Sequence, residues 1–320
     1  MRDHGHFRGS SAAFDALPLR EQTILVVGGT GFLGSHPVRK LSRIGARVVG
    51  MSRSADPREP APFGVSWRRG DASDAAQVSA VFDAVRPSIV YQLTSDSRGG
   101  QELGLVSGSL QNDLIATVNV LAQASRSRVK AVVLAGSFEE PTGDAGQSIP
   151  TSPYAAAKWA SSGYARMMFE LYGLPITILR LTMTYGPGQK SYKVIPYTIR
   201  SLIRGETARL GGGTRAVDWV YVDDAIEGLL RAAVAPQIDA QPIDIGSGRL
   251  VTVRNCLTLL GDLLERSDLL DFGAIEDRRM EREYAAFTGL AGHRLGWKPH
   301  TDLETGLRQT IEWYQAREQI

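Results

Sequence analysis

The strongest constraint on this chain is a glycine-rich turn between a short strand and a helix. The apolar run Thr23–Val27 is followed by Gly28-Gly-Thr-Gly-Phe-Leu-Gly34, and a helical stretch then extends to about Ile44. Glycines at this spacing let the chain turn tightly, bring its backbone close to a diphosphate, and pack the helix against the strand. The N–H groups that begin the helix add a partial positive charge. This turn therefore predicts a dinucleotide-binding protein.

After the turn, the chain alternates between short apolar strands and helices. Strands are expected at residues 47–51, 65–68, 88–93, 130–134 and 176–181, and helices at 73–85, 110–125 and 153–172. Near-continuous apolar strands separated by helices are typical of a parallel sheet that is covered on both faces. We therefore predict an α/β fold with a doubly wound, Rossmann-like parallel sheet.

The regular alternation ends after Leu181, which suggests a division into domains. Glycine-rich and irregular segments then separate shorter elements. We expect a mobile N-terminal tail over residues 1–20 and a dinucleotide-binding domain over 21–181. Residues 182–320 are expected to form mainly a smaller substrate-binding lobe, with some segments returning to the first domain. Because doubly wound folds bind ligands at the C-terminal ends of their strands, this lobe is expected to cover that edge.

Composition excludes several classes of protein. With 36 Lys and Arg residues against 34 Asp and Glu residues, the net charge of +2 argues against a strongly basic nucleic-acid-binding protein. The single cysteine, Cys256, cannot form an internal disulfide, and no Cys/His cluster indicates a metal site. No apolar run is long enough to cross a bilayer, and residues 1–20 lack the apolar segment of a signal peptide. We expect a cytoplasmic protein with no nucleic-acid or membrane partner.

The end of the second expected strand bears on the choice of cofactor. A carboxylate there would accept hydrogen bonds from the ribose 2′-hydroxyl of NAD, but the chain has Ser52 and Arg53. An arginine can bind the 2′-phosphate of NADP instead, so NADP(H) is favoured over NAD(H). The alternative is a solvated Arg53 paired with Asp56. Asp71, after the third strand, is a candidate acceptor for the adenine amine, or a carboxylate near the start of the next helix.

Tyr154 and Lys158 are the candidate catalytic pair. They are four residues apart in an expected helix and so lie on one face, one turn from each other. A phenol with a pKa of about 10 is a poor acid or base at neutral pH, and a neighbouring ammonium stabilises its phenolate. Ser137, just past the strand at 130–134, is placed to hold a substrate oxygen. This pattern predicts acid–base chemistry by the tyrosine beside a bound substrate oxygen; a chance Tyr–Lys pair on a helix surface is the alternative.

Together these motifs resemble the extended short-chain dehydrogenases/reductases, in the group of sugar-nucleotide epimerases, dehydratases and ketoreductases. The resemblance runs from Thr23 to about Tyr314. Besides the motifs above, it rests on Leu179-Arg-Leu181 with Tyr185-Gly-Pro-Gly188, Asp218-Trp-Val-Tyr-Val-Asp-Asp224, Asp244-Ile-Gly-Ser-Gly248, and Leu295-Gly-Trp-Lys-Pro299 with Glu304-Thr-Gly-Leu307.

The resemblance implies a set of site residues and a homodimer. Ser137, Tyr154 and Lys158 would form the catalytic triad, and the helices at 110–125 and 153–172 would pair two subunits. Cofactor contacts are expected from Gly28, Thr30, Gly31, Phe32, Leu33, Gly34, Ser52, Arg53, Asp71, Ala72, Leu93, Thr94, Tyr154, Lys158 and Leu181. Substrate contacts are expected from Ser137, Phe138, Thr182, Met183 and Arg215.

Departures from the family pattern narrow the activity. In family dehydratases, the catalytic Ser or Thr is followed by Asp-Glu, which are the acid and base of water elimination. In this chain Ser137 is followed by Phe138 and Glu139, so the acid is missing and dehydration is disfavoured. Met183 and Val217 stand where many epimerases carry Asn and a phosphate-binding Arg. Arg215 either reaches a phosphate or is solvated, and a ketone without a nucleotide also remains open. Of Asp223 and Asp224, one is expected to cap a helix over Ala225–Ala233.

The sequence favours an NADPH-dependent ketoreductase that reduces a keto group, at C4, of a nucleotide-activated deoxysugar. In that interpretation Tyr154 donates the proton, Lys158 lowers its pKa and Ser137 orients the carbonyl. The alternative is an NAD-dependent nucleotide-sugar epimerase that retains its cofactor. A non-catalytic cofactor sensor or scaffold is a third hypothesis, and the intact Ser/Tyr/Lys set argues against it.

Overall fold

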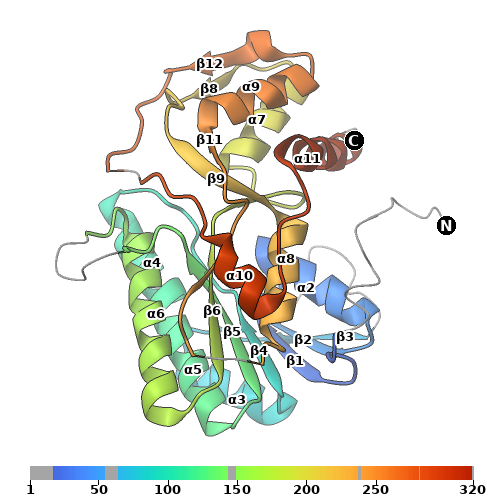
Figure 1. Cartoon of the computed structure of the whole chain (residues 1–320), viewed down its shortest axis with the longest axis vertical. Helices are drawn as coiled ribbons and strands as arrows, with labels where there is room; N and C mark the ends of the chain where they lie inside the picture. Colours follow the sequence, from blue (N-terminus) through green and yellow to red (C-terminus); the bar gives the residue numbers. More distant parts are fainter. Residues whose placement is uncertain (1–16, 55–63, 143–148, 237–238, 281, 319–320) are drawn as a thin grey trace.

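A seven-stranded sheet forms the larger of two lobes in the computed structural model, which describes residues 17–54, 64–142, 149–236, 239–280 and 282–318 (Figure 1). The strand order is β10-β6-β5-β4-β1-β2-β3, and every neighbouring pair is parallel. The strands are β1 (Thr23–Val27), β2 (Arg47–Ser52), β3 (Val65–Arg69), β4 (Ile89–Gln92), β5 (Ala131–Ser137), β6 (Ile176–Leu181) and β10 (Ile243–Ile245). This order confirms the doubly wound, Rossmann-like fold, and the reversal of strand order falls between β1 and β4.

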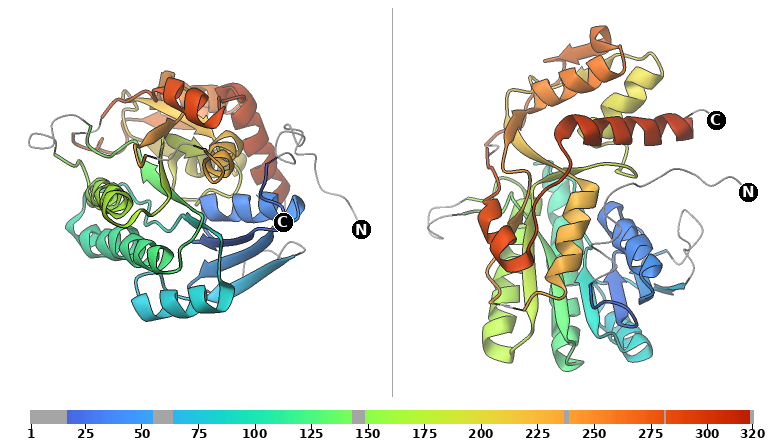
Figure 2. Two further views of the ribbon diagram at one scale, coloured as in Figure 1. Left: turned by 60° about the horizontal axis from the view of Figure 1, so that its bottom comes forward. Right: turned by 45° about the vertical axis from the view of Figure 1, so that its right-hand side comes forward.

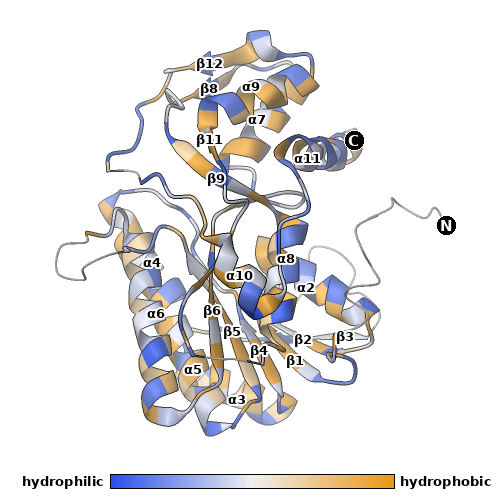
Figure 3. Cartoon of the chain, in the orientation of Figure 1, coloured by the Kyte–Doolittle hydropathy of each residue, from blue (hydrophilic) through white to orange (hydrophobic). Residues whose placement is uncertain are grey.

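Helices cover both faces of the sheet (Figure 2). Leu25 and Val27 of β1 enter the core under one layer, and Ile24 and Val26 enter the core under the other. The strands are accordingly hydrophobic along their length, while the outer sides of the helices carry hydrophilic residues (Figure 3). The first layer is α3 (Ala75–Val85), α5 (Ala116–Arg126) and α6 (Pro153–Tyr172); the second is α2 (Phe32–Arg43), α8 (Val222–Ala232) and α10 (Thr288–Leu295).

The smaller lobe lies beyond the C-terminal ends of the large sheet's strands (Figure 1). It contains the three-stranded sheet β11-β9-β7 and the two-stranded sheet β12-β8. Its strands are β7 (Met183–Tyr185), β8 (Ala208–Leu210), β9 (Ala216–Tyr221), β11 (Leu250–Thr252) and β12 (Leu270–Phe272), and its helices are α7 (Val194–Ile203), α9 (Val253–Leu263) and α11 (Leu303–Glu318). A short 3₁₀ turn, η3 (Ser267–Leu269), precedes β12.

The chain passes between the two lobes several times. After β9 it returns to the large sheet as α8 and β10, continues into the smaller lobe from β11 to β12, and returns again as α10 before α11. Asp218 of β9 joins these passes, because its carboxylate accepts hydrogen bonds from the backbone N–H groups of Ser247, Gly248 and Ala286. One buried side chain therefore links the end of β10 and the segment before α10 to the smaller lobe.

The N-terminal segment begins to pack earlier than the predicted tail boundary. Residues 1–16 lie outside the described residues, but Leu19 is fully buried in the core on the α2 side of the sheet. The folded chain thus includes part of the segment that was expected to be mobile up to residue 20. None of the helices in the described ranges is long and apolar enough to span a membrane.

Two local predictions differ from the structure. The helix expected at 110–125 begins earlier, as η1 (Leu103–Leu105) and α4 (Val106–Ser109), and includes a π-helical segment, η2 (Leu110–Ile115), before α5. Strand β5 also runs to Ser137, which makes Ser137 the last strand residue instead of a residue beyond the strand. Both differences arise in the region that holds the predicted catalytic residues.

The predicted Asp cap of α8 is wrong. The helix begins at Val222, its N-cap is Tyr221, and no side chain caps it. Asp224 accepts hydrogen bonds from the backbone of His300 and Thr301, and Asp223 forms a 3.0 Å ion pair with Lys40 of α2. Tertiary partners therefore take both carboxylates, and the helix starts before either of them.

Candidate active site

The glycine-rich turn makes two close backbone contacts that only glycine permits. Gly28 has a φ of +85°, and a Cβ atom there would lie 2.9 Å from backbone atoms of Leu93 and Thr94. A Cβ atom at Gly34 would lie 2.2 Å from the carbonyl oxygen of Gly28, so α2 packs directly on the turn. No side chain caps α2. The turn and the free helix start fit the diphosphate of a dinucleotide.

A large cavity runs along the C-terminal ends of the strands, between the two lobes. It is lined by Gly28, Thr30, Gly31, Phe32, Leu33, Ser52, Arg53, Asp71, Ala72, Leu93, Thr94, Ser137, Phe138, Tyr154, Lys158, Leu181, Thr182, Met183 and Arg215. The structure thus brings to one cavity every predicted site residue except Gly34, which packs behind the turn. Within the described ranges, no group of three or more His, Cys, Asp or Glu side chains is placed to hold a metal ion.

The three predicted catalytic residues meet where β5 ends and α6 begins. Ser137 is the last residue of β5, and Ser152 caps α6 by accepting a 3.1 Å hydrogen bond from the Ala155 N–H. Lys158 Nζ lies 5.9 Å from the centre of the Tyr154 ring and donates a 2.9 Å hydrogen bond to the carbonyl oxygen of Ala135 on β5. The start of α6 therefore sets the tyrosine and the lysine against the strand that carries the serine.

The environment of Tyr154 favours its protonated form. Burial raises the pKa of its phenol above the ordinary value, and the carboxylates of Asp113, Glu139 and Glu140 raise it further. A hydrogen bond with the Ser137 side chain acts in the opposite direction. The sequence predicts a phenol whose pKa is lowered by Lys158. In the structure, burial and the neighbouring carboxylates make the net direction of the shift upward.

Sequence reasoning missed two buried carboxyl groups beside this site. Glu140 Oε1 accepts a 2.7 Å hydrogen bond from the backbone N–H of Ser137, and burial raises the pKa of its carboxyl group. Asp113, in η2, is fully buried, and its Oδ1 lies 3.6 Å from Lys158 Nζ. Glu140 could have been suspected from its place three residues after Ser137. Asp113 gives no such signal, because only the tertiary fold brings it to Lys158.

Comparison with known proteins settles the family. A sequence profile described as the NAD dependent epimerase/dehydratase family matches residues 24–246, which is well over half of the chain. The chain belongs to this family. The match extends from β1 to just past β10, so it covers the whole large sheet and the three predicted catalytic residues.

Individual family members match over nearly the full length. A probable dTDP-glucose 4,6-dehydratase of Sinorhizobium fredii is 31% identical, over 91% of this chain and 92% of its own. The UDP-glucose 4-epimerase of Thermotoga maritima, solved with UDP-glucose, is 26% identical with a TM-score of 0.84, over 92% of this chain and 99% of its own. The dTDP-glucose 4,6-dehydratase of Streptomyces venezuelae, solved with NAD bound, is 26% identical with a TM-score of 0.82, over 92% and 98%. Family members similar to this chain therefore include both dehydratases and epimerases.

Phe138, the residue that follows Ser137, lies against Arg215 in the cavity. Phe138 is largely buried, and the guanidinium carbon of Arg215 lies 5.7 Å from the centre of its ring. Arg215 Nε also donates a 3.0 Å hydrogen bond to the carbonyl oxygen of Arg282. The structure thus places Arg215 in the cavity beside the residue that follows Ser137, instead of leaving it fully solvated.

At the cofactor end of the cavity, the tip of β2 presents an arginine. Arg53 Nη1 donates a 3.2 Å hydrogen bond to Asn112 Oδ1 at an exposed position. The alternative partner, Asp56, lies outside the described residues. Asp71 Oδ1 accepts hydrogen bonds from the N–H and hydroxyl of Ser73, while Asp74 caps α3. Part of the hydrogen-bonding capacity of Asp71 is therefore used by its own turn.

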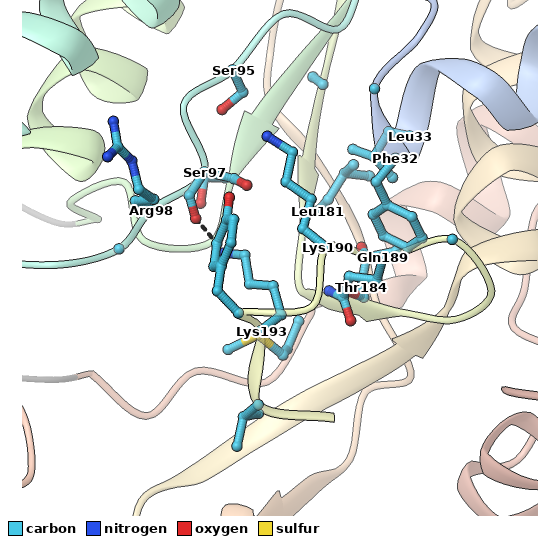
Figure 4. A pocket seen from close by; sticks show the side chains of 18 of the residues that line it. Phe32, Leu33, Ser95, Ser97, Arg98, Leu181, Thr184, Gln189, Lys190 and Lys193 are labelled. Carbon is cyan, nitrogen blue, oxygen red and sulfur yellow. Dashed lines mark hydrogen bonds between the residues drawn. The ribbon is translucent and has the colours of Figure 1, made fainter. Parts of the chain in front are cut away.

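The opposite wall carries polar groups that the sequence did not single out. Ser95, Ser97 and Arg98, after β4, and Gln189, Lys190 and Lys193, after β7, line this part of the cavity (Figure 4). Lys193 Nζ donates a hydrogen bond to the carbonyl oxygen of Ser97. Burial lowers the pKa of Lys193 to about 8. In the sequence, Lys193 could have been suspected as a cavity residue from its position shortly after the Tyr185–Gly188 motif.

Proposed function

We propose that this chain is an NADPH-dependent ketoreductase that reduces the C4 keto group of a nucleotide-linked deoxysugar. One observation carries the proposal: Ser137, Tyr154 and Lys158 are assembled in the cavity. Phe138 follows Ser137 in the sequence, at the position where the family resemblance implies the acid of a dehydratase. The site therefore contains the proton-transfer groups that ketone reduction needs, whereas it lacks the acid that water elimination needs. The names of the similar proteins, which contain 4-epimerase and 4,6-dehydratase, support a nucleotide sugar and carbon 4.

The protein groups have separate roles in this reaction. A bound nicotinamide cofactor supplies the hydride. Ser137 donates a hydrogen bond to the carbonyl oxygen and so orients the ketone. As the hydride reaches the carbon, Tyr154 gives its proton to that oxygen, and the product is an alcohol. Lys158 holds the ribose side of the site and stabilises the phenolate that Tyr154 leaves.

The proposal of NADPH rests on the tip of β2. Ser52 and Arg53 line the cavity there, and Arg53 is within reach of an incoming ligand because its side chain is exposed. A guanidinium forms charge-assisted hydrogen bonds with a phosphate. The NAD found in the Streptomyces venezuelae dehydratase is a property of that protein, so cofactor preference needs a direct measurement on this chain.

We also propose a homodimer built on the α4–α5 and α6 surfaces. Exposed large apolar side chains gather on these elements and on the turn before them: Leu103, Val106, Leu110, Tyr164, Leu171 and Tyr172. Such side chains are typical of surfaces that a second copy covers. Sedimentation analysis of the purified protein tests this, and a monomer at all concentrations would contradict it.

An epimerase is the second candidate, favoured by the close shape agreement with the Thermotoga maritima UDP-glucose 4-epimerase. An epimerase oxidises and re-reduces one carbon with a cofactor that stays bound. It predicts tightly held cofactor in the purified protein and no net consumption of NADPH.

One set of assays separates these activities. The purified protein is incubated with NADPH and dTDP- or UDP-linked 4-keto-6-deoxyglucose, and separately with UDP-glucose or dTDP-glucose. A ketoreductase oxidises NADPH only with the keto-sugars. Interconversion of UDP-glucose and UDP-galactose without net NADPH loss would establish the epimerase, and formation of a keto-sugar from dTDP-glucose would overturn both candidates.

A further inference from the structure

Asp113 stands out because its carboxylate is buried behind the catalytic lysine. It lies in the π-helical segment η2, which packs against α6. Its backbone carbonyl already accepts hydrogen bonds from the hydroxyl groups of Thr117, at 2.6 Å, and Ser161, at 3.1 Å. Single π-helical turns are frequent at functional sites. The backbone carbonyl of Asp113 is thus engaged locally, and its side chain makes a separate set of contacts.

The carboxylate itself is hydrogen-bonded by the Ser95 side chain and by one backbone N–H group. Oδ2 accepts a 3.2 Å hydrogen bond from the Asp96 N–H, whereas Oδ1 accepts no hydrogen bond from the part of the chain that the structure describes. Lys158 Nζ, which is 3% exposed, lies 3.6 Å from Oδ1. A buried charge without a partner is strongly unfavourable, and Lys158 supplies the positive charge that opposes this cost for the Asp113 carboxylate.

We propose that Asp113 is a positioning residue that holds the Lys158 ammonium between its own carboxylate and the Ala135 carbonyl, and that its charge keeps the Tyr154 phenol protonated, so that a proton is available when the ketone binds. This inference rests on the ketoreductase proposal, because reduction is the direction that needs a proton donor. Asp113 acts through Lys158 and through its charge, and it needs no contact with the substrate.

The negative charges around Tyr154 favour its protonated form. Among the carboxylates, Asp113 contributes most to the raised pKa of the phenol, after the effect of burial. Burial also raises the pKa of Asp113 itself, while Lys158 and the neighbouring hydrogen-bond donors oppose that rise. The titratable and charged groups that face this cluster are Lys158 on α6, Asp113 on η2, Asp96 after β4, Glu139 and Glu140 after β5, and Arg180 on β6.

The test compares the parent with Asp113→Asn and Asp113→Glu. Alcohol oxidation requires deprotonated Tyr154, so its rate rises with pH through the apparent pKa of the phenol. We expect Asp113→Asn to move this rise down by about one pH unit and to increase oxidation at neutral pH about tenfold. Asp113→Glu keeps the charge and is expected to retain the parental profile. Asp224→Asn, a buried carboxylate at the His300 turn, is the matched control and should not move it.

An unchanged pH profile in Asp113→Asn, or a shifted one in Asp113→Glu, overturns the proposal. A purely structural role would alter stability or KM without moving the profile. A measurement without substrate separates this inference from the proposed function. With oxidised cofactor present and Tyr154→Phe as the blank, tyrosinate absorbance should appear at lower pH in Asp113→Asn. If that shift occurs without any ketone reduction, only the proposed function fails; if reduction occurs without the shift, only this inference fails.

Discussion

The two walls of the cavity are built differently. On the β5–α6 wall, Tyr154 and Lys158 belong to a twenty-residue helix, and Lys158 is held by a strand carbonyl and a buried carboxylate. On the opposite wall, Arg215 and Lys193 come from loops and are held largely by backbone carbonyls of other segments. Groups on regular elements keep a fixed geometry, whereas loops tolerate change. We therefore expect the first wall to carry the chemistry and the second to select the substrate.

Tyr154→Phe should give the largest effect and should act on rate alone. The ring still packs, but the proton donor is lost, so kcat should fall about 10²- to 10⁴-fold while cofactor affinity stays nearly unchanged. Steady-state kinetics and cofactor titration measure the two quantities separately. Tyr172→Phe, at an exposed position at the end of the same helix, is a matched control. A near-parental rate in Tyr154→Phe would remove this residue from the mechanism.

Arg53→Ala should act on cofactor affinity alone. Loss of a charge-assisted hydrogen bond to the 2′-phosphate should weaken NADPH binding by about 10- to 100-fold and leave NADH binding almost unchanged. Ser52→Asp should reverse the preference, because a carboxylate repels the phosphate and accepts from a ribose hydroxyl. Fluorescence titration with both cofactors measures this. Equal or tighter NADH binding by the parent would show that the interpretation of the β2 tip is wrong and would favour the epimerase.

Arg215→Ala should weaken substrate binding without slowing the chemical step, because Arg215 lies on the wall opposite Tyr154 and Lys158. It removes a cation beside Phe138 but no group of the proton-transfer set. We expect KM for a nucleotide-linked ketone to rise about tenfold, as for one lost charge-assisted hydrogen bond, with kcat changed far less. The comparison of kcat and KM for Arg215→Ala and Arg215→Lys checks this. A fall in kcat alone would place Arg215 on the chemical side of the cavity.

Lys193 should give the smallest effect, a pH dependence of substrate binding. Its pKa is lowered to about 8, so the ammonium is present at neutral pH and is lost as the pH rises through that value. KM for an anionic substrate should therefore rise a few-fold between about pH 7 and about pH 9, and Lys193→Met should flatten this rise. The same lowered pKa affects folding stability in the opposite direction: stability increases with pH, whereas substrate binding weakens. Because the unfolded chain binds the proton more tightly, this group makes folding more favourable as pH rises from about 8 toward its ordinary range.

The larger lobe could be predicted from local pattern, and the smaller one could not. The apolar runs of β1, β2 and β6 and the glycine turn specify their own structure, since each is a continuous segment with a matching period. The three residues proposed as catalytic followed from one helix face and one strand end. The smaller lobe depends on three-residue strands such as β8 and β11, which are too short to carry a pattern. The position of Asp113 beside Lys158 and the raised pKa of Tyr154 arise from burial in the tertiary fold, which no single segment of the sequence reveals.

The repeated crossing of the chain has a consequence for how this protein is made. A fragment that ends at Leu181 would contain six of the seven strands of the large sheet, yet it would lack β10, α8 and α10. The edge of β6 would then be unpaired, and apolar side chains on the α2 side would lose Ile226, Leu230, Ile243 and Leu295 as neighbours. During synthesis, the first domain cannot finish folding until residues near 297 have left the ribosome, so the nascent sheet needs protection from aggregation for most of translation.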